Sequence, residues 1–470
     1  MHDVSASDSA TLLTRRSTMS NVRAEIERKT PGSKRAHERS LEVLGQLAVG
    51  TLAMPYPIYI RESRGSRVTD VDGNEYIDLA LGFGPHILGH APGVVVDAVK
   101  DAAERGFQWA LHNPYQEHLA RLIVEAVPCA DKVEFCNTGT EATMFAIRAA
   151  RAYTRRDKIA MFDGGYHGAH DYVMVRAAAG SPHDAPTFNT VGDGIPKATL
   201  QNTIMLPYRS RKAFDLIRTH KDELALVLIE PVQSSNPRLD HVEWLRELRE
   251  VCRESGVLFL MDEIITGFRL AYGGAQELFD ITPDLATYGK VMGGGLPIGA
   301  IAGRADIMDV FSRGAASPET FTRGGPRLPG VFAAGTFGGN PISMVAGTAA
   351  LTYLRDHPES YKYLAEQSMR LANEVNRFCQ SEEIPAQLMS ALSMFFMRIQ
   401  RGGPIQSARD IDPSLKAADD AFFMHLLNNG VVIPGIHQFH ISTAHTPKDI
   451  DFVIEAMKHS FLEVRKEGLL

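Results

Sequence analysis

The chain of 470 residues carries 49 Lys and Arg against 56 Asp and Glu, a net charge of −7, and 44% of its residues are apolar. These values are typical of a globular protein with two or three domains, and they exclude collagen, disorder and coiled coil as descriptions of the whole chain. The slight acidic excess also argues against nonspecific binding of nucleic acid, which requires an excess of Lys and Arg.

The ends of the chain and its cysteines favour a cytoplasmic protein. Residues 1–18 are rich in Ser and Thr and contain no apolar core, so we expect a disordered tail instead of a signal peptide. No stretch reaches 18 apolar residues, and we therefore expect no membrane span. The four cysteines are scattered, which argues against a disulfide framework or a zinc module, and the histidines lack metal-binding spacing, so no metal site is expected.

The first elements are predicted to be a helix and a hairpin. Apolar residues recur at helical spacing across residues 20–48. Two runs of alternating polarity, SRVTDV and EYIDLA, then flank Asp72-Gly73-Asn74, which is a strong signal for a tight turn.

From about residue 92, helical patterns alternate with short apolar runs, which predicts a largely parallel α/β sheet. We expect helices over residues 92–105, 115–127, 139–153 and 241–254, and strands over 133–137, 158–163, 224–230 and 257–263. Gly, Pro, Ser and Ala dominate residues 176–203 and 312–334, which we interpret as long functional loops. Further helices are expected over 342–355, 360–380 and 447–465.

Residues that follow each apolar run are candidates for a site, because ligands bind at the carboxyl ends of parallel strands. Gly139 and Thr140 open a helix directly after a strand, where free backbone N–H groups attract anions. Taken alone, an ordinary helix cap explains this pair more simply. Tyr166 stands between glycines after the next strand, either as a ring that stacks on a planar ligand or as a surface aromatic in a turn.

Three ionisable residues follow the later runs. Glu230 ends the run LALVLI as a site carboxylate or as a residue that orients a loop. Asp262 ends the run VLFLM, where an unpaired carboxylate is costly, so its partner is a positively charged ligand nitrogen, a helix end or Arg269. Lys290 precedes a glycine-rich segment, a placement that suits a nucleophilic amine and differs from a Walker loop, in which the glycines come first.

Together these motifs supply the four contacts that pyridoxal 5'-phosphate (PLP) needs: a phosphate site, a stacking ring, an acid for the ring nitrogen and a lysine for the aldehyde. Asp262 would keep the ring nitrogen protonated, because an adjacent negative charge favours the charged form. Lys290 would hold the cofactor and then move the substrate proton.

The segments NTGTEA, GGYHG, IEPV, MDEIITGFR, YGKVMGGGLPIGA and GTFGGNP together resemble those of class III (fold-type I) PLP-dependent aminotransferases. The resemblance runs from about residue 22 to 465. It implies an α/β fold with a mostly parallel central sheet, flanking helices and a smaller α+β domain. It also implies a large PLP-binding domain at residues 92–345 and a small domain built from residues 19–91 and 346–470.

The same resemblance assigns seven residues to the cofactor: Gly139, Thr140, Tyr166, Asp262, Ile264, Lys290 and Thr336. We add Glu230 because it follows an apolar strand, and His167 because it follows Tyr166. In that assignment Gly139 and Thr140 bind the phosphate, Tyr166 and Ile264 cover the ring, and Lys290 forms the Schiff base.

Thr336, in GTFGGNP, matches a threonine that reaches the phosphate of the other subunit. The resemblance therefore implies a homodimer with shared active sites.

The closest resemblance is to the branch of glutamate-1-semialdehyde aminomutases and β-amino-acid aminotransferases. Members of this branch commonly hold a substrate carboxylate with an arginine before the hairpin, and a bidentate arginine suits that role. Residues 47–60 contain no arginine here, and Ala48 stands near the expected position. His437 and Phe83 replace a glutamate and a tryptophan of the aminomutases, so we assign both to the substrate.

The sequence therefore favours an aminotransferase that moves an amino group from a donor to a ketone or aldehyde acceptor of secondary metabolism, by ping-pong chemistry through an internal aldimine on Lys290. The alternative is glutamate-1-semialdehyde 2,1-aminomutase, which transfers the amino group within one molecule. In that case another arginine would hold the carboxylate, for example Arg269, Arg323 or Arg327. Both activities use small molecules, and neither involves nucleic acid or a membrane.

Overall fold

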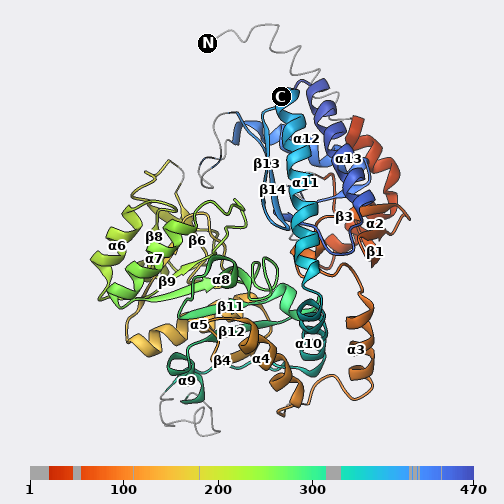
Figure 1. Cartoon of the computed structure of the whole chain (residues 1–470). Helices are drawn as coiled ribbons and strands as arrows, with labels where there is room; N and C mark the ends of the chain where they lie inside the picture. The colour runs from red at the N-terminus through yellow and green to blue at the C-terminus, as the bar shows by residue number, and fades with distance from the viewer. Residues whose placement is uncertain are drawn as a thin grey trace. The chain divides into compact units, whose positions relative to one another are not determined.

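The computed structural model describes residues 21–45, 54–109, 111–178, 180–313, 330–401, 405, 410, 413–433, 435 and 437–470 (Figure 1). The predicted tail at residues 1–18, Ala48, Arg323 and Arg327 lie outside these ranges. In the described part of the chain, no helix is long and apolar enough to cross a membrane.

The chain divides into two compact units, a larger one of Gly93–Tyr361 and a smaller one that takes residues up to Pro92 together with Lys362–Ile405 and Asp410–Leu470. The second boundary lies after Tyr361, later than the expected end of the cofactor domain at residue 345. The reason is that helix α10 (Pro341–Asp356) packs on α3 (Gly93–Ala103) and α4 (Pro114–Ala126), which belong to the larger unit.

A seven-stranded sheet forms the centre of the larger unit, with the strand order β4-β12-β11-β10-β9-β5-β8. From one edge to the other these strands are Lys132–Cys136, Gly299–Gly303, Leu285–Tyr288, Leu258–Asp262, Leu224–Ile229, Lys158–Phe162 and Thr203–Leu206. Only β12 runs antiparallel to its neighbours. The predicted, mostly parallel α/β sheet is therefore confirmed.

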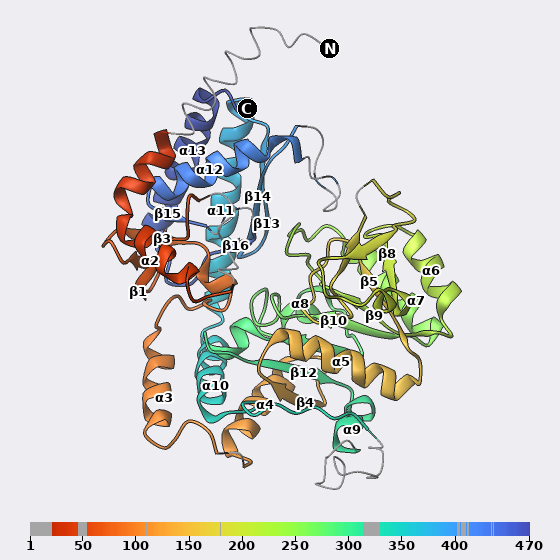
Figure 2. The ribbon, with the colours of Figure 1, turned by 180° about the vertical axis from the view of Figure 1, so that it is seen from behind.

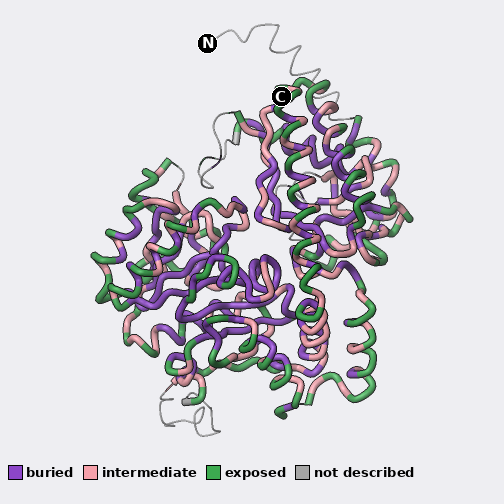
Figure 3. Tube along the Cα trace, in the orientation of Figure 1, coloured by how far each residue is buried: buried purple, intermediate pink, exposed green. Residues whose placement is uncertain are grey.

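Helices cover this sheet (Figures 1 and 2), and apolar residues of two of them, α5 and α9, form one hydrophobic cluster with buried strand residues. Helix α5 (Gly139–Thr154) packs on several strands and on α9 (Ala305–Arg313), while α6 (Lys212–His220) packs on α7 (Val242–Ser255). Every residue of β9 is buried, which suits a central strand with both faces covered. Figure 3 shows the same burial along the neighbouring strands. The larger unit also contains the short helix α8 (Gly274–Phe279).

The smaller unit contains two short sheets and several helices. One sheet has the order β1-β2-β3-β15 (Ile60–Arg64, Arg67–Asp70, Glu75–Asp78, Val431–Val432), and the other β13-β14-β16 (Ala386–Ala391, Met394–Ile399, Phe439–His440). The helices are residues 21–29, α2 (Pro31–Leu41), α11 (Glu359–Ser381), α12 (Lys416–Asn428) and α13 (Pro447–Lys466). The predicted hairpin is present as the antiparallel pair β2 and β3.

Two predictions of secondary structure need correction. The expected loop at 176–203 contains the antiparallel pair β6 (Val175–Ala177) and β7 (Phe188–Thr190), whose three-residue strands are too short to show alternation. The helix expected over 20–48 is split, because Pro31 begins a new helix and lacks the N–H that would continue the first. Most of the loop expected at 312–334 lies outside the described residues.

Candidate active site

Three of the predicted residues follow neighbouring parallel strands of the large sheet. Asp262 ends β10, Lys290 comes two residues after β11, and Glu230 comes directly after β9. Because the carboxyl ends of parallel strands share one edge, the sheet brings these side chains together as expected. Asp262 and Glu230 are close enough to Lys290 to act on the charge of its amine.

Asp262 is buried, and both of its carboxylate oxygens have hydrogen-bond partners. Its Oδ2 lies 2.8 Å from Nδ1 of His167, and its Oδ1 accepts bonds from the Thr287 hydroxyl at 3.0 Å and from the Ile264 N–H at 3.2 Å. These donors offset the cost of a buried carboxylate. Thr287 was not predicted, although it pairs directly with Asp262 across β10 and β11 and the register could have revealed it.

His167 is held from its main chain as well as from its ring. Its carbonyl accepts a hydrogen bond from the Thr143 hydroxyl at 2.7 Å, so helix α5 fixes the histidine that faces Asp262. Its Nε2 is buried and has no hydrogen-bond partner among the described residues. Thr143 lies inside α5 and carries no sequence signal for this role.

Glu230 orients the segment that carries Tyr166. Its Oε2 accepts the Tyr166 N–H at 3.0 Å, and its Oε1 accepts the Ser234 N–H at 3.3 Å. Burial raises the pKa of Glu230 to about 7. The Tyr166 side chain remains 59% exposed and is free to meet a planar ligand. These two contacts show that Glu230 orients the segments that carry Tyr166 and Ser234.

The start of α5 combines a helix cap with the features of an anion site. The Thr138 side chain caps the helix by accepting the Glu141 N–H at 3.1 Å. Gly139 and Thr140 begin the helix, and the first N–H groups of a helix have no partner within it. A Cβ atom on Gly139 would lie 2.6 Å from Cδ1 of Ile264, so only glycine fits beside this isoleucine without displacing it.

Lys290 is partly buried and has a left-handed backbone with φ of +44°. Such strain in a residue other than glycine is concentrated at functional sites. Burial lowers the pKa of the Lys290 amine, and the nearby carboxylates of Asp262 and Glu230 oppose that shift. A larger neutral fraction makes the amine a better nucleophile and base.

Three further predicted residues make contacts of their own. The Thr336 side chain is exposed, and its carbonyl accepts a hydrogen bond from Nε2 of Gln108. Phe83 and His437 lie together in the smaller unit, with ring centroids 4.7 Å apart in an edge-on arrangement.

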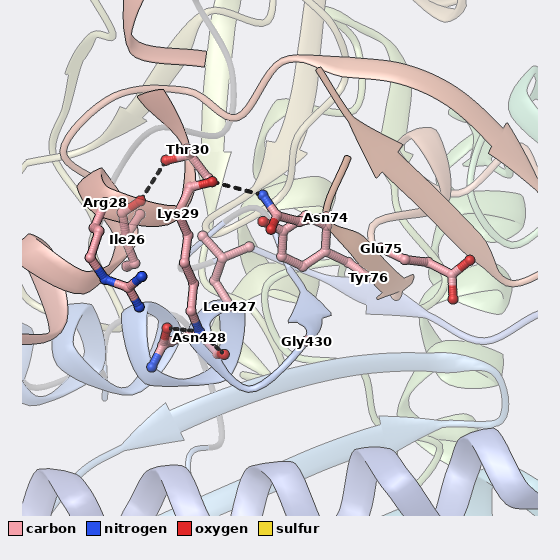
Figure 4. A pocket seen from close by; sticks show the side chains of 10 residues that line it. All are labelled: Ile26, Arg28, Lys29, Thr30, Asn74, Glu75, Tyr76, Leu427, Asn428 and Gly430. Atoms are coloured by element: carbon pink, nitrogen blue, oxygen red, sulfur yellow. Dashed lines mark hydrogen bonds between the residues drawn. The ribbon is translucent and has the colours of Figure 1, made fainter. Parts of the chain in front are cut away.

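A separate cavity of about 330 Å³ opens in the smaller unit, and Figure 4 shows its lining. It is lined by Ile26, Arg28, Lys29, Thr30, Asn74, Glu75, Tyr76, Leu427, Asn428 and Gly430. None of the predicted site residues is among them.

The donors and acceptors at the sheet edge fit PLP. A buried carboxylate aligned by three donors suits a protonated ring nitrogen, and a partly buried amine of lowered pKa suits an aldehyde. The helix start at Gly139 suits a phosphate.

Comparison with known proteins identifies the family. The family model of class-III aminotransferases matches residues 48–459, so the chain belongs to the class III aminotransferases. It is 40% identical over 420 residues to the glutamate-1-semialdehyde 2,1-aminomutase of Methanocaldococcus jannaschii, covering 87% of this chain and 92% of that enzyme. Its identity to the aminomutase of Aquifex aeolicus is 41% over 415 residues, or 87% and 93% of the two chains. An omega-transaminase from Sphaerobacter thermophilus has a similar structure, with a TM-score of 0.84 and 32% identity over 92% of this chain and 98% of that chain.

The chain is thus a PLP-dependent enzyme with the fold-type I architecture that the sequence predicted. The predicted resemblance to class III enzymes, with aminomutases among the relatives, is confirmed.

Proposed function

We propose that the enzyme moves an amino group within a single substrate, as a glutamate-1-semialdehyde 2,1-aminomutase does. One observation carries this proposal: two relatives that bear that name are 40% and 41% identical to the chain over 87% of its length. The sequence analysis favoured transfer between two molecules, with transfer within one molecule as the alternative. The proposal reverses that order, because similarity over 87% of the chain outweighs single departures in the segments that we assign to the substrate.

PLP supplies an aldehyde that binds amines and a ring that accepts electrons from the substrate. Asp262 places a negative charge at the ring nitrogen, and His167, Thr287 and the Ile264 N–H hold that carboxylate in place. Fixed charge of this kind requires no rearrangement during the reaction.

Lys290 would supply the amine that holds the cofactor aldehyde and would also serve as the base that moves the substrate proton. Its lowered pKa keeps part of the amine neutral, as a base requires. In this proposal Gly139 and Thr140 would hold the phosphate, Tyr166 and Ile264 would contact the ring, and Phe83 and His437 are assigned to the substrate.

Transfer between two molecules is the second candidate. Residues 47–60 contain no arginine for a substrate carboxylate, and the omega-transaminase of Sphaerobacter thermophilus is 32% identical. An assay with glutamate-1-semialdehyde as the only amine distinguishes transfer within one molecule from transfer between two molecules. Repeated turnover to 5-aminolevulinate supports the first proposal, and dependence on an added amine overturns it in favour of the second.

We also propose that the working unit is a cytoplasmic homodimer, with the larger unit as the PLP-binding domain. The exposed Thr336 side chain is available to a second subunit, as the resemblance implies. Two identical chains would then each contribute to both sites.

A further inference from the structure

The turn that carries Phe83 has a strained backbone. Leu81, Gly82, Phe83 and Gly84 have φ angles of +46°, +63°, +66° and +109°. Leu81 and Phe83 are not glycines, and left-handed residues with a Cβ atom persist only where their surroundings enforce them. The structure must therefore contain groups that hold this turn.

Asp78, the last residue of β3, provides that support. Its Oδ1 accepts the Ala80 N–H at 2.7 Å, and its Oδ2 accepts the Leu81 N–H at 3.2 Å. The carboxylate is 3% exposed, so these bonds are shielded from water. Charged acceptors make stronger hydrogen bonds than neutral ones, and both bonds act on the first residues of the turn.

The carboxylate itself is fixed by His90. Nε2 of His90 lies 2.6 Å from Oδ2 of Asp78. The His90 main chain is in turn paired with Gly65, since each residue donates its N–H to the carbonyl of the other, at 2.8 and 2.9 Å. Asp78 therefore joins the strained turn to the rigid hairpin region of the smaller unit.

The turn presents Phe83 to a defined partner. The Phe83 ring meets His437 edge-on with centroids 4.7 Å apart, and both side chains are half-buried. A small rotation of the turn would move the ring away from His437, because Phe83 lies only two residues beyond the Leu81 N–H that Asp78 binds.

We propose that Asp78 is a positioning residue for substrate binding, which acts by holding the Leu81–Gly84 turn and thereby the Phe83 ring. The inference rests on the proposed function in one respect, the assignment of Phe83 to the substrate. Asp78 touches neither substrate nor cofactor in this proposal. Its effect on the reaction passes entirely through Phe83.

The test compares four holoenzymes: wild type, Asp78→Asn, Phe83→Ala and the double variant. KM and kcat are measured from the absorbance change as the concentration of glutamate-1-semialdehyde is raised. The same titration is repeated with benzylamine, an amine that lacks a carboxylate. We expect Asp78→Asn to raise KM about tenfold and to change kcat less than about threefold, because one charged hydrogen bond is lost outside the reacting centre. In the Phe83→Ala background the same substitution should have no further effect on KM.

Asp70→Asn is the matched control. Asp70 is another fully buried carboxylate that holds a turn of the same unit, by accepting the N–H groups of Asp72 and Asn74 at 2.9 and 2.8 Å. It should lower the urea midpoint of unfolding and leave KM unchanged.

Each outcome is decisive. If Asp78→Asn and Asp70→Asn change KM alike, or if the effects of Asp78→Asn and Phe83→Ala simply multiply, Asp78 supports the fold only and the inference fails. If Phe83→Ala changes KM and Asp78→Asn does not, the inference fails while the assignment of Phe83 stands. If Phe83→Ala leaves KM unchanged with both compounds, that assignment and the inference fail together.

Discussion

Asp262 and His167 form a buried pair in which a carboxylate oxygen lies 2.8 Å from the histidine Nδ1, and neither side chain is more than 4% exposed. The histidine is fixed from α5 through its carbonyl and the carboxylate from β11 through Thr287, so two elements of the fold align one acid. In a low-dielectric site such alignment determines how strongly the acid acts on a ligand charge.

Asp262→Asn should lower kcat by about 10²–10³-fold, because the neutral amide no longer stabilises a protonated ring nitrogen. His167→Ala should cost less, about tenfold, since it removes one of three donors. His167→Asn is its control, because the amide nitrogen can take the place of Nδ1. The measurements are steady-state kcat and the absorbance spectrum of the bound cofactor. Equal losses for His167→Ala and His167→Asn would contradict a role through Nδ1.

Glu230 should make stability depend on pH. Burial raises its pKa to about 7 from an ordinary value of 4.5, so the folded state favours the protonated carboxyl. The stabilisation is complete below pH 4.5 and is lost as the pH rises through about 7. The total loss of unfolding free energy is at most about 3 kcal/mol.

Urea unfolding of wild type and Glu230→Gln, from below pH 4.5 to above pH 7, measures this effect. Across that range the unfolding free energy of Glu230→Gln should decline less than that of the wild type, by up to about 3 kcal/mol. Glu254→Gln, at an exposed carboxylate, should keep the wild-type decline. An equal change in unfolding free energy across this range for the wild type, Glu230→Gln and Glu254→Gln would contradict the account.

Gly139→Ala should weaken PLP binding about tenfold, because the new Cβ would lie 2.6 Å from Cδ1 of Ile264 and must displace it. Ile264→Val removes that Cδ1 atom, so the double variant Gly139→Ala, Ile264→Val should recover part of the affinity. The measurement is the dissociation constant of PLP by absorbance titration of apoenzyme. The explanation fails if the double variant binds PLP more weakly than Gly139→Ala alone.

Shared sites can be tested by mixing two inactive variants, Lys290→Ala and Thr336→Ala. If Thr336 serves the site of the partner subunit, a mixed dimer contains one intact site. Random mixing should then restore about a quarter of the wild-type activity. Restoration should follow the time course of subunit exchange. Two variants that stay as inactive together as apart would show that Thr336 acts within its own chain, and a Thr336→Ala variant with wild-type activity would show that Thr336 serves neither site.

The sequence was sufficient to predict which residues follow the strands of the large sheet. Asp262 and Lys290 could be identified because a buried apolar strand ends at one and a glycine-rich segment follows the other. Thr287 and Thr143 could not, since their roles depend on strand register and helix packing, which no local pattern reveals. The β6–β7 pair was missed for a related reason, because strands of three residues have no measurable period.

The segments that we assign to the substrate illustrate a different limit. The sequence identified Phe83 and His437 as departures from relatives, and their rings meet at 4.7 Å. The strain of the turn that carries Phe83 was not predictable, because Leu81 and Phe83 adopt left-handed conformations that their residue types disfavour. The contacts of Asp78 with the N–H groups of Ala80 and Leu81 help to explain how these conformations persist.

The most direct measurement is the yield of 5-aminolevulinate from glutamate-1-semialdehyde by purified holoenzyme with no other amine present. Transfer within one substrate predicts about one product per substrate consumed, over many turnovers, with no gain in rate when L-glutamate or benzylamine is added. Product that stops at one equivalent of bound cofactor, and resumes only when an amine is supplied, would contradict the account.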